Sequence, residues 1–157
     1  MFSFRQSLEL ERPAEAVWPY LAALEQVPLW EHGILDVRVV SPRPIRVGSQ
    51  ITADRLYAGQ TTRLSGYVKE WKPGRTGTIT LRGGPQLEST VTDSVKPIGP
   101  ERCLVTYAAT GRLSGWLDLL SPVLPLIGRW EARKNLARLR RRILAGIPPT
   151  SPEPTPD

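Results

Sequence analysis

The sequence predicts an α+β fold in which one curved antiparallel sheet of about seven strands wraps around a long C-terminal helix, with two short helices after the first strand. Three observations support this prediction. The N-terminal stretch alternates polar and apolar side chains, the middle of the chain holds β-rich segments in succession, and the last part shows helical periodicity. Consecutive strands joined by short loops favour antiparallel pairing, and only the last helix is long enough to cover such a sheet.

The N-terminal segment predicts one strand followed by two short helices. The stretch SFRQSLELE has the period of a half-buried strand. Pro13 suits the first turn of a helix, Glu15 complements the positive end of its dipole, and Pro19 predicts a kink or a late helix start. Because Pro28 and Gly33 interrupt EQVPLWEHG, the second helix is expected to be short.

The central region is almost entirely β-rich from Ile34 to Tyr107 and predicts six strands. Its segments are rich in β-branched and aromatic residues, and turn sequences such as PRPIRVG, KPG, GGP and KPIGP separate them. The expected strands are ILDVRVVS, SQITADRLY, TTRLSGYVKEW, TGTITLR, QLESTVTDSV and ERCLVTYAATGRL.

The C-terminal region predicts a long helix, which Pro122 and Pro125 break or bend in its first half. Residues 146–157 are rich in proline and poor in apolar side chains, which predicts a disordered tail after a single domain over residues 1–145. The apolar positions at near-helical spacing are Ile127, Trp130, Leu136, Leu139 and Ile143.

Composition limits both location and chemistry. The chain has no run of about 20 apolar residues and no secretory signal at its start, so a cytoplasmic protein without a transmembrane segment is expected. Its one cysteine, Cys103, fits a reducing compartment and lies far from its one histidine, His32, so no metal site is predicted. The sequence contains no GxSxG, phosphate-binding loop or dinucleotide fingerprint, and we therefore expect no cofactor.

The net charge of +6 comes from one segment, residues 129–142, which holds seven basic residues against one acidic residue. The simplest interpretation is a solvated helix end that complements the helix dipole. The alternative is a docking patch for an anionic membrane or for RNA. The residues of this basic patch are Arg133, Lys134, Arg138, Arg140, Arg141 and Arg142.

Several residues along this order of elements carry a family resemblance. They are Pro13, Glu15, Val17 and Trp18 at the first helix, Trp30 after the second, Val47 and Gly48 before a strand, and Val68 and Pro73 at the end of the next. With them, the region from Phe4 to Leu144 resembles the START-like or Bet v 1-like helix-grip superfamily (SRPBCC), in its polyketide cyclase/dehydrase-like branch. The resemblance implies an apolar cavity walled by the final helix, with Trp30 near its mouth and Trp18 packing behind it.

The candidate cavity residues are aromatic, apolar and a few polar side chains. Tyrosine offers an apolar ring with a hydroxyl that can orient a ligand, and arginine or histidine could hold or protonate a polar group. For each of them ordinary packing or solvent exposure is the alternative. The apolar and aromatic candidates are Trp30, Tyr57, Tyr67, Trp71, Tyr107, Leu120, Leu124 and Ile127, and the polar candidates are His32, Arg63 and Arg82.

Three functional hypotheses follow. The leading one is a binding protein, non-enzymatic or at most weakly catalytic, that holds a small hydrophobic molecule, aromatic, polyketide or lipid-like, between sheet and helix. The second is an enzyme resembling the polyketide cyclases and aromatases, with no catalytic residue assigned. The third is a module that docks on a membrane or on RNA through the basic patch.

Overall fold

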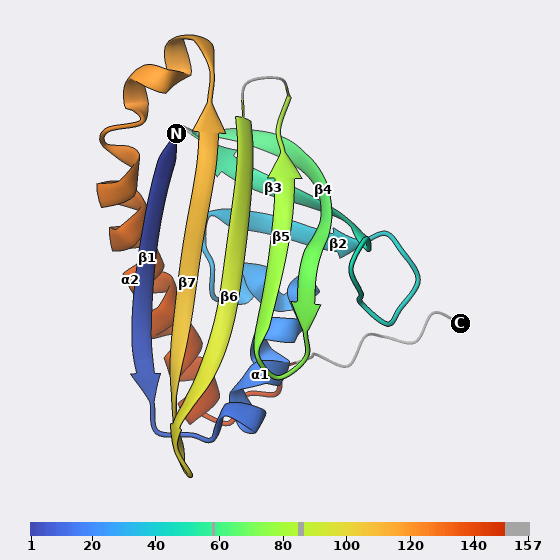
Figure 1. Cartoon of the computed structure of the whole chain (residues 1–157), viewed down its shortest axis with the longest axis vertical. Helices are drawn as coiled ribbons and strands as arrows, with labels where there is room; N and C mark the ends of the chain where they lie inside the picture. Colours follow the sequence, from blue (N-terminus) through green and yellow to red (C-terminus); the bar gives the residue numbers. More distant parts are fainter. Residues whose placement is uncertain (58, 85–86, 150–157) are drawn as a thin grey trace.

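The computed structural model describes residues 1–57, 59–84 and 87–149, and the figures show its arrangement (Figure 1). The described residues form seven strands, two α-helices and two 3₁₀ helices. These elements are β1 (Phe2–Leu10), α1 (Ala14–Ala22), η1 (Leu24–Leu29), β2 (Ile34–Val39), β3 (Gln50–Tyr57), β4 (Gln60–Lys72), β5 (Thr76–Arg82), β6 (Leu87–Gly99), β7 (Arg102–Leu113), η2 (Gly115–Leu120) and α2 (Leu124–Leu144).

The strands build one antiparallel sheet in the order β1-β7-β6-β5-β4-β3-β2. Strands β2 to β7 form a meander, and β1 closes the other end by pairing with β7 over its full length. The sheet curves, with α2 along the β1 and β7 side and α1 at its lower end in this view, against β6 (Figure 1). The predicted helix-grip arrangement of seven strands, two short helices and a long final helix is confirmed.

The concave face of the sheet, which faces α1 and α2, carries the main core. On β7, Cys103, Val105, Tyr107 and Ala109 are buried at every second position, as the pleat of a half-covered strand requires. The long helix contributes a matching stripe at helical spacing, so sheet and helix bury each other's apolar side chains. The helix residues of this core are Ala132, Leu136, Leu139 and Ile143.

For the first helix the sequence predicts a kink or a late start at Pro19. The helix begins at Ala14 and continues through Pro19 to Ala22, so the expected late start is wrong. Pro19 lies on the exposed side of α1, where the Glu15 carbonyl that loses its helical partner can be solvated. The short second helix is confirmed as η1.

The strand β6 also extends further than predicted. The sequence KPIGP was expected to be a turn, but β6 runs through Pro97 to Gly99. Beyond Ser94, β6 has no partner on β5 and pairs only with β7. A proline is tolerated there because its missing N–H faces the side without a neighbouring strand.

Two residues in the first turns of α2 were predicted to point inward but are exposed. Ile127 and Trp130 are 49% and 58% exposed, whereas the predicted Leu136, Leu139 and Ile143 are buried. The buried stripe passes through Gly128, where a Cβ would lie 2.3 Å from the Phe4 ring. At about 100° per residue, Trp130 lies almost opposite this stripe and therefore faces solvent. Of the predicted tail, residues 150–157 lie outside the described part of the chain.

Candidate functional site

Four polar side chains from separate elements point toward the concave side of the sheet. Glu31 follows η1, Arg55 belongs to β3, Asp93 to β6 and Tyr107 to β7. Glu31 and Tyr107 are buried, and the Arg55 side chain is 23% exposed. We call these four residues the polar cluster, because they place two carboxyl groups, a guanidinium and a phenol in an otherwise apolar core.

Glu31 connects two of the other members. The Tyr107 hydroxyl donates a hydrogen bond of 3.2 Å to Glu31 Oε1, and Arg55 Nη1 lies 3.6 Å from the same oxygen. Arg55 Nη2 lies 4.0 Å from Glu131 Oε2 on α2, and the Arg55 guanidinium lies 5.4 Å from the centre of the Tyr57 ring. Arg55 thus bridges the loop after η1, the sheet and the long helix.

The backbone explains why Arg55 reaches the interior. Ile51 and Ala53, four and two residues before it on β3, are buried on the concave face, so Arg55 shares their side of the strand. Arg55 pairs with Ile34 of β2, and the register of the two strands shifts between Ile34 and Asp36. The guanidinium packs beside Gly33, where an added Cβ would be in ordinary contact, 3.5 Å from Arg55 Nη2.

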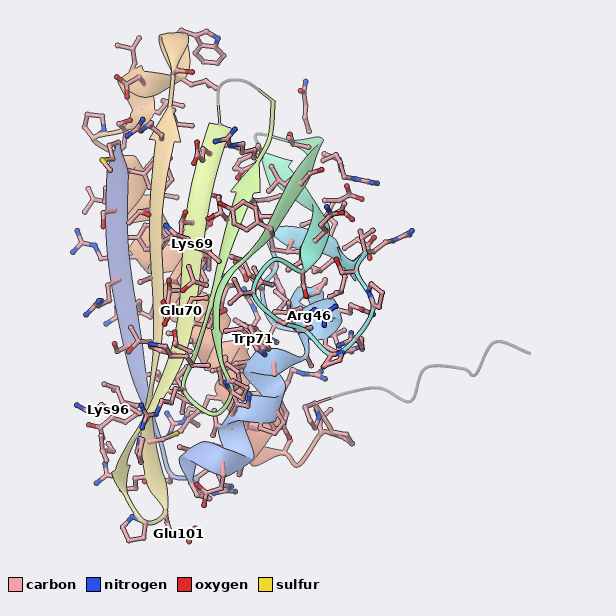
Figure 2. All side chains as sticks on the ribbon, turned by 45° about the vertical axis from the view of Figure 1, so that its right-hand side comes forward. Arg46, Lys69, Glu70, Trp71, Lys96 and Glu101 are labelled. Carbon is pink, nitrogen blue, oxygen red and sulfur yellow. The ribbon has the colours of Figure 1, made fainter. Side chains whose placement is uncertain are left out.

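Asp93 is enclosed by the Tyr107 ring on one side and by the Trp71 ring on the other. Its direct neighbours across the strands are Tyr107 on β7 and Gly77 on β5. The Trp71 ring covers Gly77, whose added Cβ would be 2.7 Å from Trp71 Cζ3, and Trp71 itself packs on Trp18 of α1 at 5.4 Å between ring centres (Figure 2). This enclosure buries Asp93 Oδ1, which has no hydrogen-bond partner among the described residues.

Burial and mutual charge shift the protonation of the polar cluster. Burial, followed by the nearby Glu31 charge, raises the pKa of Asp93 to about 8. Burial also raises the pKa of Glu31, although Arg55 and the Tyr107 hydrogen bond oppose this. The pKa of Tyr107 is raised well above its usual value, again chiefly by burial. At neutral pH Asp93 is therefore mainly a neutral carboxyl group, able to donate as well as accept a hydrogen bond.

Four of the predicted cavity aromatics lie on or near the concave face. Tyr107 belongs to the polar cluster, Tyr57 is half-buried beside Arg55, and Trp71 is half-buried between α1 and β5. Trp30 is 2% exposed, and its buried Nε1–H has no hydrogen-bond partner among the described residues. Trp18, predicted to pack behind the cavity, is half-buried against the core.

The structure places the other predicted candidates elsewhere. Tyr67 is exposed on the convex face, because its strand neighbours Gly66 and Val68 take the concave side. Arg63 forms an exposed ion pair with Asp54, and Arg82 lies 3.4 Å from Glu88 at the surface. His32 is exposed in the turn before β2. Tyr67, Arg63 and Arg82 therefore do not face the interior, and His32, predicted near the cavity mouth, lies at the surface.

The three cavity candidates on η2 and α2 are partly buried in one case and exposed in the other two. Leu124 is half-buried, whereas Leu120 and Ile127 are exposed, because η2 has no buried residue and α2 turns Ile127 outward. In the basic patch, Arg138 and Arg142 are half-buried and the other members are exposed. Arg138 also donates a hydrogen bond of 2.7 Å to Asn135.

Glu31, Arg55 and Asp93 were not among the predicted site residues. The signal for Asp93 was a carboxylate in phase with Val91 and Val95 on an alternating strand, and that for Arg55 was its phase with Ile51 and Ala53. Glu31 follows a 3₁₀ helix, where no period indicates which side chains turn inward. Within the described residues no group of three or more His, Cys, Asp or Glu is placed to hold a metal ion.

The structure also shows two surface hollows away from the polar cluster. One of about 220 Å³ lies at the end of the sheet where β5 and β7 finish, and an open one of about 600 Å³ lies over β3 and β4. In addition, the inward-facing Ile79, Leu81, Ser89 and Val91 remain only half-buried. The helices therefore leave part of the concave face near Asp93 incompletely covered.

The sequence model of one protein family, described as polyketide cyclase / dehydrase and lipid transport, matches residues 1–144. The chain belongs to this family. Among solved structures, a protein from Thermus thermophilus, TTHA0849, has 18% identity and a TM-score of 0.75, covering 92% of this chain and 99% of that one. A START superfamily protein from Mycobacterium smegmatis has 18% identity, the same two coverages and a TM-score of 0.74.

A third solved structure with the same fold is of a protein whose name states an activity. The Zhui aromatase/cyclase from Streptomyces sp. R1128 has 13% identity and a TM-score of 0.63, with 92% of each chain covered. At these identities the solved structures show a shared fold. No match was found among curated protein sequences. Among the described residues, the helices lack the combination of length and hydropathy that a membrane-spanning helix requires.

Proposed function

We propose that the protein binds a small hydrophobic molecule carrying an oxygen acceptor, such as an aromatic ketone, on the concave face of the sheet beside the polar cluster. Membership of a family described by polyketide and lipid handling supports the hydrophobic class of ligand. The half-buried Ile79, Leu81 and Val91 supply apolar surface on that face, and burying it would contribute about 25 cal/mol per Å².

The observation that carries the proposal is the pair of buried polar atoms without partners, Asp93 Oδ1 and Trp30 Nε1. Leaving such an atom unpaired costs about 1–3 kcal/mol, so proteins rarely keep one without a reason. Trp30 Nε1–H is only a donor, as is the Arg55 guanidinium, and neutral Asp93 can donate as well. Such donors beside an apolar surface would suit a carbonyl oxygen of the ligand.

The proposal is tested with two probes of equal shape, acetylnaphthalene and isopropenylnaphthalene, which differ in C=O against C=CH₂. Tryptophan emission is followed during titration of each. We expect saturable binding of both, with the ketone bound about tenfold more tightly, since one hydrogen bond contributes roughly 1.4 kcal/mol. Asp93→Val should weaken this preference for the ketone, whereas Asp93→Asn, which keeps hydrogen-bonding groups, should retain it.

The control variant is Tyr67→Phe on the convex face, which should bind both probes like the natural protein. Absence of saturable binding for either probe would contradict the binding function. Equal affinity for both probes, unchanged by Asp93→Val, would leave a hydrophobic site but remove the polar cluster from ligand recognition.

A second candidate function is acid–base catalysis of the cyclase or dehydrase type, and Asp93 is the observation that favours it. A carboxyl group with a pKa of about 8 exchanges protons near neutral pH, as enolisation next to a carbonyl requires. In such a step the Asp93 carboxylate would take a proton from the carbon beside the carbonyl, and the electron pair would move to the carbonyl oxygen held by Trp30 or Arg55.

The catalytic candidate is tested by NMR through loss of the methyl signal of acetylnaphthalene in D₂O. We expect exchange faster than in buffer alone, with a rate that rises with pH up to about 8 as Asp93 loses its proton. Asp93→Asn should abolish the acceleration while still binding the ketone. Exchange no faster than in buffer would exclude this catalysis and leave the binding function standing.

A further inference from the structure

The segment from η2 to the first turns of α2 exposes a contiguous set of large apolar side chains. Trp116 and Leu119 are 69% and 80% exposed, and η2 has no buried residue. We call this set the apolar cap; it comprises Trp116, Leu119, Val123, Leu126, Ile127 and Trp130. Scattered apolar side chains are common on protein surfaces, but so many within one short segment usually meet a partner.

The apolar cap lies at one end of the molecule. Strand β7 leads into η2 beyond the end of the sheet, close to the N-terminus, and α2 then turns back along β1 (Figure 1). Asp118 of η2 is held by the Met1 amino group at 3.7 Å and by the Ser121 hydroxyl at 2.9 Å. These contacts hold η2 in place while its apolar side chains point to solvent.

Cations border the apolar cap on the exposed side of α2. Arg129, Arg133 and Lys134 are exposed, and no carboxylate of the described residues lies within ion-pair distance of them. Lys134 Nζ lies 3.4 Å from the centre of the Trp130 ring, which joins the cap to the cations directly. The two acidic side chains nearby are already engaged, Asp118 with Met1 and Glu131 with Arg55.

We propose that the apolar cap and these three cations dock the protein on the surface of an anionic lipid bilayer. Leucine and tryptophan side chains next to lysine and arginine are the combination that binds at the boundary between headgroups and acyl chains. The apolar side chains would enter this boundary, and each cation near anionic headgroups would contribute roughly 1 kcal/mol. The proposal does not depend on which molecule the polar cluster binds.

Other occupants fit the surface less well. RNA would use the cations but would leave Leu119, Val123 and Leu126 exposed to water. A second copy of the chain, related by a two-fold axis through the cap, would bring Arg129, Arg133 and Lys134 close to their own equivalents, and like charges across an interface are unfavourable. A bilayer surface satisfies both the apolar and the cationic side chains.

The test is co-sedimentation of the full chain with vesicles of phosphatidylcholine alone and with vesicles of roughly three parts phosphatidylcholine to one part phosphatidylglycerol. We expect binding to the anionic vesicles that weakens with salt, and little binding to the neutral ones. The variant Leu119→Ser/Leu126→Ser/Trp130→Ser should lower the affinity at least about tenfold. The variant Arg129→Gln/Arg133→Gln/Lys134→Gln should lower it and reduce its salt dependence.

Matched controls separate docking from general surface effects. Leu35→Ser/Val40→Ser/Val47→Ser removes three similarly exposed apolar side chains on β2 and the loop after it. Arg46→Gln/Lys69→Gln/Lys96→Gln removes three exposed cations outside η2 and α2 (Figure 2). The apolar control should bind like the natural protein, and the cationic control should bind at least several-fold more tightly than the α2 charge variant. Circular dichroism confirms that every variant is folded.

Three results would overturn the proposal. The first is unchanged vesicle binding of the Leu119→Ser/Leu126→Ser/Trp130→Ser variant. The second is a dimer in analytical ultracentrifugation that this variant dissociates, without vesicle binding by the natural protein, which would assign the cap to a second copy. The third is binding to structured RNA in the absence of vesicle binding, which would assign the cations to nucleic acid.

Discussion

Asp93 on β6 and Tyr107 on β7 are direct cross-strand partners, and both side chains point to the concave face of the sheet. The Tyr107 hydroxyl donates its hydrogen bond to Glu31 Oε1 at 3.2 Å. Asp93 Oδ1 has no hydrogen-bond partner among the described residues. Burial raises the pKa of both acids; Arg55 and Tyr107 oppose this rise at Glu31, whereas no group that the structure describes opposes it at Asp93. This difference between two nearby acids has consequences for stability that depend on pH and on their partners.

Stability should fall as pH rises from about 4 to about 8, because of Asp93. Its pKa is raised from 3.8 in a solvated state to about 8 in the fold. Between these values the folded protein holds a proton that the unfolded chain has lost, so raising the pH favours unfolding by up to about 1.4 kcal/mol per pH unit. Urea unfolding at several pH values should show this slope, and Asp93→Asn should reduce it and raise stability at pH 8.

The control for this slope is Asp36→Asn, which changes a carboxylate on β2 that is paired with Arg38 at the surface. It should leave the slope at its natural value. A slope that Asp93→Asn does not alter would show that Asp93 is ionised in the folded protein, contrary to its enclosure.

Tyr107→Phe should destabilise the fold by about 1–3 kcal/mol, because it removes the donor that supports a buried carboxylate. The aromatic ring stays, so the packing of β7 is kept. Tyr67→Phe is the matched control, since Tyr67 is half exposed on the convex face, and it should change stability by less than about 0.5 kcal/mol. Urea denaturation compares the two. Equal effects would mean that the hydrogen bond to Glu31 contributes nothing measurable.

The arrangement of elements could be predicted from the sequence because it depends on long periodic patterns. In ERCLVTYAATGRL an apolar residue stands at every second position from Cys103 to Ala109, and β7 buries Cys103, Val105 and Tyr107 as that period requires. The order of strands then follows from short loops and antiparallel pairing, with β1 as the one non-consecutive neighbour.

The candidate site could be predicted only in part, because strand phase does not by itself reveal which face is covered. Tyr67 and Tyr107 both lie on strands, yet only Tyr107 faces inward, and one residue of phase separates the two outcomes. Arg55 and Asp93 are in phase with buried neighbours, but charged residues are seldom buried unless paired, so composition argued against them. The exposed Ile127 and Trp130 follow from the rotation of α2 fixed by Gly128 against Phe4, a tertiary contact absent from any local pattern.

Arg55→Met should cost about 3–5 kcal/mol, because it leaves Glu31 buried without its cation. The double variant Glu31→Gln/Arg55→Met should recover most of this loss, since it removes both charges and keeps similar volumes. Arg63→Met breaks an exposed pair with Asp54 on the opposite face and should cost less than about 1 kcal/mol. Chemical denaturation of the natural protein and these variants, with Glu31→Gln alone, tests the coupling. Additive losses in the double variant would show that Arg55 and Glu31 do not stabilise each other.

Gly128→Ala should destabilise the protein although alanine favours helices by about 1 kcal/mol over glycine. An added Cβ would lie 2.3 Å from Phe4 Cε1, so α2 could no longer approach β1 as closely. Phe4 cannot move freely, because its ring stacks between Phe2 at 6.5 Å and Tyr107 at 6.0 Å. Overpacking of this kind costs typically 1–3 kcal/mol, which offsets the helical gain.

The compensating variant Gly128→Ala/Phe4→Leu distinguishes this clash from a backbone effect. If the clash causes the loss, the double variant is more stable than the sum of the two single changes by about 1 kcal/mol or more, because leucine leaves space for the new methyl group. Thermal and urea denaturation of the four proteins give the coupling directly. Strict additivity would mean that α2 shifts over β1 to accommodate alanine. The Phe4 ring would then not determine how closely the helix approaches the sheet.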